Sequence, residues 1–141
     1  MILLEAILKK YNFSRRTIPQ EITSLVVEKS INFQLQEDYK FYIDNFIEHE
    51  CFIGSEYLKL WDLEDILENN NGHHIIKYLT NTLAIGTNGG GECIAIEYLG
   101  EDNYRVVLFP FIDLNRENYI EIGHSFTDLL NRLDQGKEWF N

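Results

Sequence analysis

A glycine-rich stretch, Gly86–Glu92 (GTNGGGE), constrains the fold more than any other feature of the chain. Four of the nine glycines lie between positions 86 and 91. The runs on either side, Leu83–Ile85 and Cys93–Tyr98, are short and apolar, as strands are. A connection this short joins neighbouring strands only when they run antiparallel. We therefore expect a β-hairpin within an antiparallel sheet, with Asn88 and the glycines supplying the positive φ angles of the turn.

The glycine-rich stretch does not match a phosphate-binding motif. A P-loop has glycine, four residues and then Gly-Lys-Ser/Thr. Gly86 and Gly91 have this spacing, but Glu92 stands where lysine is required, and its carboxylate would repel a phosphate. The dinucleotide fingerprint opens a helix, whereas the residues after Gly91 are typical of a strand. We therefore assign the glycines to the hairpin and expect no cofactor.

Three helices are expected before the sheet. Apolar residues at helical spacing predict helices over residues 2–11 and 36–46. Between them, Thr17–Gln20 has a capping-box pattern with proline in its first turn, which predicts the start of a helix. The apolar face of this helix is expected to contain Ile22, Leu25 and Val26.

Short strands and helices alternate in the rest of the chain. Residues 51–54 and 57–61 are aromatic and apolar and are separated by a Gly-Ser-Glu turn, which predicts a strand pair. Asp62 is expected to cap a helix that runs to Asn70, and the polar segment ENNNGHH that overlaps its end is expected to be a loop. Residues 104–111 predict a central strand. A last helix is expected to begin at Ser125.

This order of elements predicts an α+β fold: an antiparallel sheet of about four to six strands with helices packed around it, the N-terminal helices first. The 141 residues contain no repeat or linker, so we expect one domain over 1–141, and we favour a monomer. No apolar run is long enough to span a membrane. Two cysteines and the absence of a signal-peptide pattern favour a cytoplasmic protein.

The net charge of −11 argues against direct binding to nucleic acid or to an anionic membrane. Between Glu37 and Glu68 the chain has ten acidic and two basic residues, so this segment holds −8 of the total. The acids either form an ordinary solvated face or a docking surface for a basic protein. The candidate surface consists of Asp38, Asp44, Glu48, Glu50, Glu56, Glu64, Asp65 and Glu68.

No group of residues forms a recognisable catalytic or metal-binding pattern. His73-His74 and the His49/Cys51 pair lack the further ligands that a metal site needs. Carboxylates are plentiful around Asp62, but general acid–base catalysis requires one with a raised pKa in a pocket. A small hydrolase would need such a pocket. We therefore expect neither metal nor enzymatic activity, and assign Trp61 to core packing or to anchoring a partner.

Four stretches in order, QLQEDYKFYIDNF, EYLKLWDLEDILENN, LAIGTNGGGECIAIEY and IEIGHSFTDLLNRL, resemble the SUKH superfamily of Smi/Knr-type domains. The strongest piece is the hairpin over Ile85–Ile96; the others are Leu-Trp before an acidic helix and a late Ser-Phe-x-x-Leu helix start. The resemblance covers about Ile22 to Leu133. The family-motif residues, expected to be mainly structural, are Trp61, Gly86, Asn88, Gly89, Gly90, Gly91, Glu92, Ser125 and Phe126.

The resemblance implies a non-enzymatic protein-binding module. Many bacterial members of the superfamily are immunity proteins that bind a cognate secreted toxin and block it. For this chain, the acidic segment would suit a basic target such as a nuclease toxin. The alternative implied by the fungal members is a regulatory or scaffold domain that recognises a cellular protein without any toxin.

Overall fold

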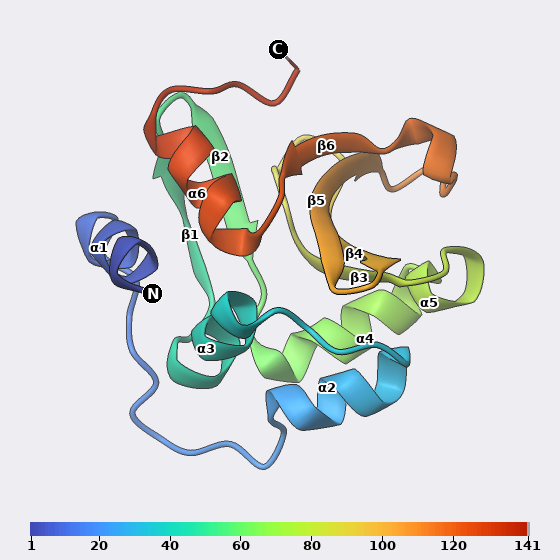
Figure 1. The fold of residues 1–141 in the computed structure, drawn as a ribbon, viewed down its shortest axis with the longest axis horizontal. Coiled ribbons are helices and arrows are strands. Elements are labelled where there is room, and N and C mark those ends of the chain that lie inside the picture. Colours follow the sequence, from blue (N-terminus) through green and yellow to red (C-terminus); the bar gives the residue numbers. More distant parts are fainter. Residues whose placement is uncertain (141) are drawn as a thin grey trace.

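The computed structural model describes residues 1–140 and confirms an α+β fold built on a six-stranded antiparallel sheet (Figure 1). Each strand pairs with the next along the chain, so the order in the sheet is the order in sequence. The strands are β1 (His49–Ile53), β2 (Glu56–Leu60), β3 (Thr82–Thr87), β4 (Glu92–Gly100), β5 (Asn103–Pro110) and β6 (Ile120–Gly123).

Three helices precede the sheet, as expected, and the others lie in its connections (Figure 1). The N-terminal helix packs against the last one. The helices are α1 (Ile2–Lys10), α2 (Ser24–Ile31), α3 (Glu37–Asn45), α4 (Leu63–Gly72), α5 (Ile75–Tyr78) and α6 (Phe126–Asp134), with the short 3₁₀ helix η1 (Arg116–Asn118). None of them within residues 1–140 is long and apolar enough to cross a membrane.

The central strands are buried on both faces, and successive side chains alternate between two apolar clusters. On β4, Ile94 and Ile96 join the main core with the long helices, whereas Cys93 and Ala95 join a smaller cluster on the other face. Residues of α5 and of the segment that follows β5 cover this second cluster. Burial on both faces explains why these strands are almost continuously apolar.

A buried ion-pair network holds the segment after β5 onto the sheet. The Glu97 side chain on β4 is 1% exposed. Its two carboxylate oxygens accept hydrogen bonds from Arg105 Nε on β5 at 2.6 Å and from Arg116 Nε on η1 at 2.8 Å. Because both arginines satisfy this buried charge, η1 is tied to the sheet although none of its three residues is buried.

The second helix was predicted in the wrong place. Residues 17–23 are irregular, and α2 begins only at Ser24. The predicted apolar face is also wrong: Leu25 is 61% exposed, whereas Val27 is fully buried. The cause lies in tertiary structure, because Asp44 of α3 accepts hydrogen bonds from Ser24 N and Oγ and thereby fixes both where the helix begins and how it is rotated.

The predicted loop at ENNNGHH is largely helical. The helix α4 continues to Gly72, and α5 follows almost at once. Asn70 is fully buried and explains the extension. Its side chain donates to Ala84 O at 2.8 Å and accepts from Ala84 N at 2.8 Å, which satisfies the strand edge of β3. The short elements α5, η1 and β6 were not predicted.

The glycine-rich hairpin is confirmed between β3 and β4, but its backbone differs from the expectation. Positive φ occurs at Gly89 and Gly91, and not at Asn88, Gly86 or Gly90. The Asn88 side chain instead closes the turn, accepting from Gly90 N at 2.9 Å and donating to Glu92 Oε1 at 2.8 Å. Glu92, which excluded a phosphate site, is therefore part of the turn itself.

Gly86 has a different role: it allows the backbones of β2 and β3 to lie close together. A Cβ at this position would lie 2.1 Å from Lys59 O, where β2 meets β3. Only two residue pairs, Lys59–Thr87 and Leu60–Gly86, connect these strands, and on the β4 side the register shifts just before Gly86, between Ala84 and Gly86. This narrow junction joins the β1–β2 hairpin to the rest of the sheet, which curls away from it (Figure 1).

We expect Gly86→Ala to lower the free energy of unfolding by about 2 kcal/mol or more, because the methyl group must displace backbone of β2. Gly90→Ala is the matched control: its nearest neighbour would be Glu92 Oε1 at 3.4 Å, so a change below about 0.5 kcal/mol is expected. Urea unfolding of both variants measures the difference. Equal stability of the two would contradict the role assigned to Gly86.

Candidate protein-interaction surface

The motif residues at the two helix starts act within the fold. Ser125 Oγ accepts a hydrogen bond from Asp128 N at 3.0 Å and so caps α6. Phe126 is buried against Tyr42, with ring centroids 4.7 Å apart. Trp61 is partly buried and packs against both apolar clusters, where the β2–α4 junction passes between them. These side chains consolidate the core.

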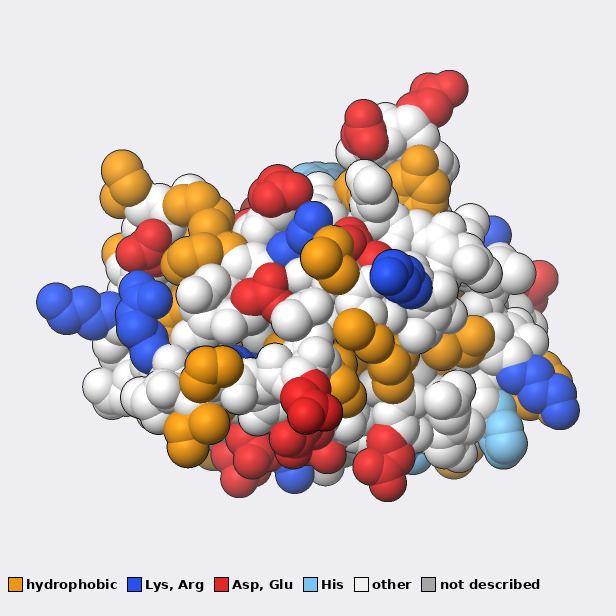
Figure 2. All heavy atoms as spheres, turned by 90° about the horizontal axis from the view of Figure 1, so that it is seen from below, with side chains coloured by type: hydrophobic (Ala, Val, Ile, Leu, Met, Phe, Trp, Pro, Cys, Tyr) orange, Lys and Arg blue, Asp and Glu red, His pale blue; other side chains and the backbone are white. Residues whose placement is uncertain are grey.

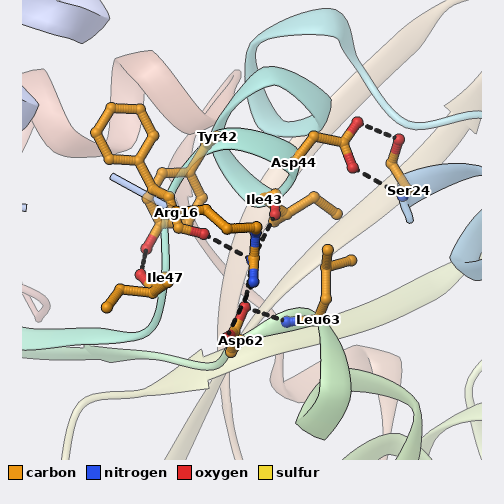
Figure 3. Close-up of polar contacts among 9 residues, drawn as sticks. Arg16, Ser24, Tyr42, Ile43, Asp44, Ile47, Asp62 and Leu63 are labelled. Carbon is orange, nitrogen blue, oxygen red and sulfur yellow. Dashed lines mark hydrogen bonds and ion pairs between the residues drawn. The ribbon is translucent and has the colours of Figure 1, made fainter. Parts of the chain in front are cut away.

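A buried arginine that the sequence did not single out organises the junction between α3 and α4 (Figure 3). The Arg16 side chain is 7% exposed, and its guanidinium lies 2.5 Å from Asp62 Oδ1. Its Nη2 atom, which makes this contact with Asp62, also donates to Ile43 O at 3.0 Å and to Phe46 O at 2.8 Å. Asp62 also accepts from Leu63 N at 2.7 Å, so it caps α4 as predicted.

Three of the eight candidate acids are engaged in contacts that hold the fold together. Asp44 binds Ser24 at the start of α2 (Figure 3). Asp38 Oδ2 accepts from both the backbone N and the Oγ1 of Thr127 at 2.8 Å, which ties α3 to α6. Glu56 Oε2 accepts from Trp139 N at 2.6 Å and so anchors the C-terminal segment.

The other five acids form two groups on either side of the β2–α4 junction. Glu48 directly precedes β1 and Glu50 is its second residue; between them His49 pairs with Leu60 at the end of β2. Glu64, Asp65 and Glu68 lie on the first turns of α4, a helix without a basic residue. None of these five forms an ion pair with a lysine, arginine or histidine of residues 1–140.

These acids do not merge into one continuous patch. Figure 2 views the molecule from the side where α2 and α4 lie in Figure 1. Acidic side chains gather at one border of this face and are scattered elsewhere among hydrophobic and a few basic side chains. The arrangement gives the protein a broad negative field and not a single acidic pocket.

The residues that could carry chemistry lie apart or in inert settings. Within residues 1–140, no group of three histidine, cysteine or acidic side chains could hold a metal ion. None of the acids between Glu37 and Glu68 is buried. Burial raises the pKa of the Cys93 thiol well above its usual range, and that of Cys51 less strongly. A raised pKa suppresses the thiolate that nucleophilic catalysis requires.

Comparison with known families decides the relationship. Residues 20–132 match the model of the SMI1 / KNR4 family (SUKH-1). The chain belongs to the SMI1/KNR4 family. The match agrees with the resemblance seen from Ile22 to Leu133, and it leaves the N-terminal helix α1 outside the family region. A comparison with curated proteins found no match.

The family region includes every element from α2 through most of α6. Within it lie both the Gly86–Glu92 hairpin and the Asp62 cap, but Arg16, which binds Asp62, lies just before it. The segment ahead of the SMI1/KNR4 region therefore contributes a buried charge to the core of this chain.

We expect Arg16→Met to lower the free energy of unfolding by about 3 kcal/mol, because it leaves the Asp62 carboxylate and two carbonyls without their charged donor. Arg15→Met is the control, since the Arg15 side chain is 58% exposed and reaches Glu5 only at 3.7 Å. Its effect should stay below about 1 kcal/mol. Thermal and urea unfolding measure both; similar losses would argue against Arg16 as the organising residue.

The two cysteines should differ in reactivity. In the folded protein at mildly alkaline pH, we expect a thiol reagent to label Cys51 slowly and to leave Cys93 unlabelled, because Cys93 is fully buried and its pKa is the more strongly raised. Labelling followed by peptide mass spectrometry reads out each site. Denaturant should equalise the two rates, and rapid labelling of Cys93 in the native protein would contradict the assignment.

Proposed function

We propose that this protein is an immunity protein that binds a cognate secreted toxin domain and neutralises it without catalysis. The observation that carries the proposal is the SMI1/KNR4 match over residues 20–132, since immunity to toxins is a known role in this family. The proposal includes action in the cytoplasm as a single domain over 1–141. Which toxin the protein binds depends on the chemistry of its surface, because the fold alone does not select a partner.

The charge of the molecule favours a basic partner. The net charge is −11, and the five acids beside the β2–α4 junction have no basic partner within residues 1–140. A field of this sign attracts a positively charged protein over distances comparable with the Debye length, about 10 Å at moderate salt. A nuclease toxin, whose own surface must bind phosphates, has the complementary charge.

Binding without catalysis is supported by the state of the titratable groups. The one acid that is fully buried within residues 1–140, Glu97, is held by two arginines and is not presented to a pocket. The Asp62 carboxylate is likewise engaged, because it pairs with Arg16 and accepts the capping hydrogen bond from Leu63 N. Neither carboxylate is available for proton transfer to a substrate.

The direct test is coexpression with the toxin domains encoded beside this gene. We expect one of them to lose its toxicity and to co-purify with the protein. A protein that rescues no toxin but retrieves a stable partner from toxin-free cells would instead be a regulatory or scaffold domain. Failure of both would remove the proposal.

Charge removal should act on the association rate. We expect Glu64→Gln with Glu68→Gln to slow association with the toxin several-fold at low salt, to change dissociation little, and to lose this difference at high salt. The control removes equal charge elsewhere, with Glu101→Gln and Glu117→Gln, both of which are exposed. Stopped-flow mixing at two salt concentrations compares them. Equal slowing in both double variants would mean that net charge matters and its position does not.

A further inference from the structure

The two edges of the sheet are not equally protected. At the β1 edge, His49 Nε2 lies 3.0 Å from Tyr11 O, and its ring lies against the Phe13 ring, tilted by 35° with centroids 4.0 Å apart. The segment after α1 thus covers the start of that strand. No strand of residues 1–140 pairs with the outer side of β6, and Figure 1 shows it as the last strand of the curled sheet. Such an edge offers free backbone donors and acceptors.

An apolar hollow of about 330 Å³ lies directly beside this free edge. It is bounded by β6, the end of α6 and the C-terminal segment. Its floor is formed by the buried side chains Ile122, Leu133 and Trp139, and its rim by Ile120, which is 40% exposed, and Phe140, which is 67% exposed. A hollow of this size accepts one or two apolar side chains.

The hollow is held open by contacts within the fold. Trp139 N donates to Glu56 Oε2 at 2.6 Å, which fixes the C-terminal segment against the β1–β2 turn. Arg132 on the opposite wall is held by Asp128 at 2.9 Å. Both walls are therefore positioned before any partner arrives, which reduces the entropy lost on binding.

The rim has a charge that selects the occupant. Neither Glu121 nor Glu138 has a lysine or arginine partner among the described residues, and Arg132 is already neutralised by Asp128. One lysine, Lys137, lies with them. With Arg132 and Asp128 taken as a neutral pair, Glu121, Glu138 and Lys137 leave the rim one negative charge, and the whole molecule has the same sign at −11. A segment with lysine or arginine beside its apolar side chains complements this rim.

We propose that the β6 edge and its hollow form the docking site for an extended segment of the partner protein, in which apolar and basic residues alternate. The segment pairs through its backbone with Ile120–Ile122 and places an apolar side chain between Ile120 and Phe140. This inference rests on the proposed function, in that the partner is a protein. Charge excludes a second copy of this chain as the occupant: pairing β6 with β6 brings two Glu121 carboxylates together between molecules that each carry −11.

The test uses a synthetic probe, so that it does not depend on finding the toxin. The probe is a capped peptide of alternating lysine and valine, about eight residues long, which is enough to pair along a short strand. The control peptide has the same composition, but the backbone nitrogens on its pairing side are methylated. Amide spectra of the ¹⁵N-labelled protein, recorded at moderate salt, locate the binding site.

We expect the first peptide to shift and protect the amides of β6, the last turn of α6 and residues 137–140, and the methylated peptide to bind at least about tenfold more weakly. Phe140→Ala and Ile120→Ala should each weaken binding about tenfold, as truncation of an anchor contact does. Ile112→Ala is the matched control: Ile112 is 97% exposed but does not line the hollow, so its truncation should leave peptide binding unchanged.

Four outcomes would overturn the inference. The peptides could bind equally well, or could shift amides across the acidic face of α4, either of which means that charge alone is recognised. The chain alone could form a dimer that Phe140→Ala dissolves, which would make a second copy the occupant. If a toxin is neutralised but binds the Ile120 and Phe140 variants as tightly as wild type, the proposed function stands and the docking site falls. If no toxin is found, the peptide result still decides the site.

Discussion

The buried guanidinium of Arg16 is the interaction on which the arrangement of the N-terminal half depends. It comes from the irregular segment between α1 and α2, yet it meets the last carbonyls of α3 and the capping carboxylate of α4. Backbone pairing adds to this, because Arg16 N donates to Asn45 O and Ile47 N donates to Ser14 O. A helix C-terminus has unsatisfied carbonyls and a negative dipole end, so a buried cation there answers both needs at once.

This charge also connects the helices to the sheet. Asp62 follows β2 by two residues and caps the start of α4. Near the other end of α4, the Asn70 side chain bonds to both the backbone N and the backbone O of Ala84 on β3. The helix is thus fixed at its start by an ion pair and near its end by a side-chain amide. The β1–β2 hairpin is therefore positioned against the rest of the sheet by α4 as well as by the narrow β2–β3 junction at Gly86.

The parts of the fold that were predictable from sequence are those whose signals are local. The hairpin, the Asp62 and Ser125 caps and the apolar face of α6 each follow from residues within a few positions of one another. The start of α2 was not predictable in this way. The Pro19 pattern is a valid local start signal, but Asp44 of α3, twenty residues from Ser24, decides the matter. Likewise, the helix was predicted to end at Asn70, and its continuation to Gly72 became understandable only once the bonds from Asn70 to Ala84 were known.

The two candidate surfaces also differ in how far the sequence could predict them. The acidic segment was visible in the sequence because charge can be counted along a chain. Composition could not show, however, that Asp38, Asp44 and Glu56 make contacts that hold the fold together. The β6 hollow had only one local signal, the alternation in Ile120-Glu121-Ile122, because its other wall comes from beyond α6.

These two kinds of surface suit two steps of one binding event. A diffuse negative field acts at a distance and changes how often partners meet, but exposed charges separated by water add little to the lifetime of a complex. An apolar hollow beside a free strand edge has no long-range effect, yet it supplies backbone hydrogen bonds and desolvated contact, which govern dissociation. Acids spread over α4 and β1 need no precise geometry, whereas the hollow has walls fixed by Glu56 and Asp128. Under the proposed function, fast capture of a toxin and a long-lived complex would draw on both properties, and the two surfaces do not have to lie on the same face.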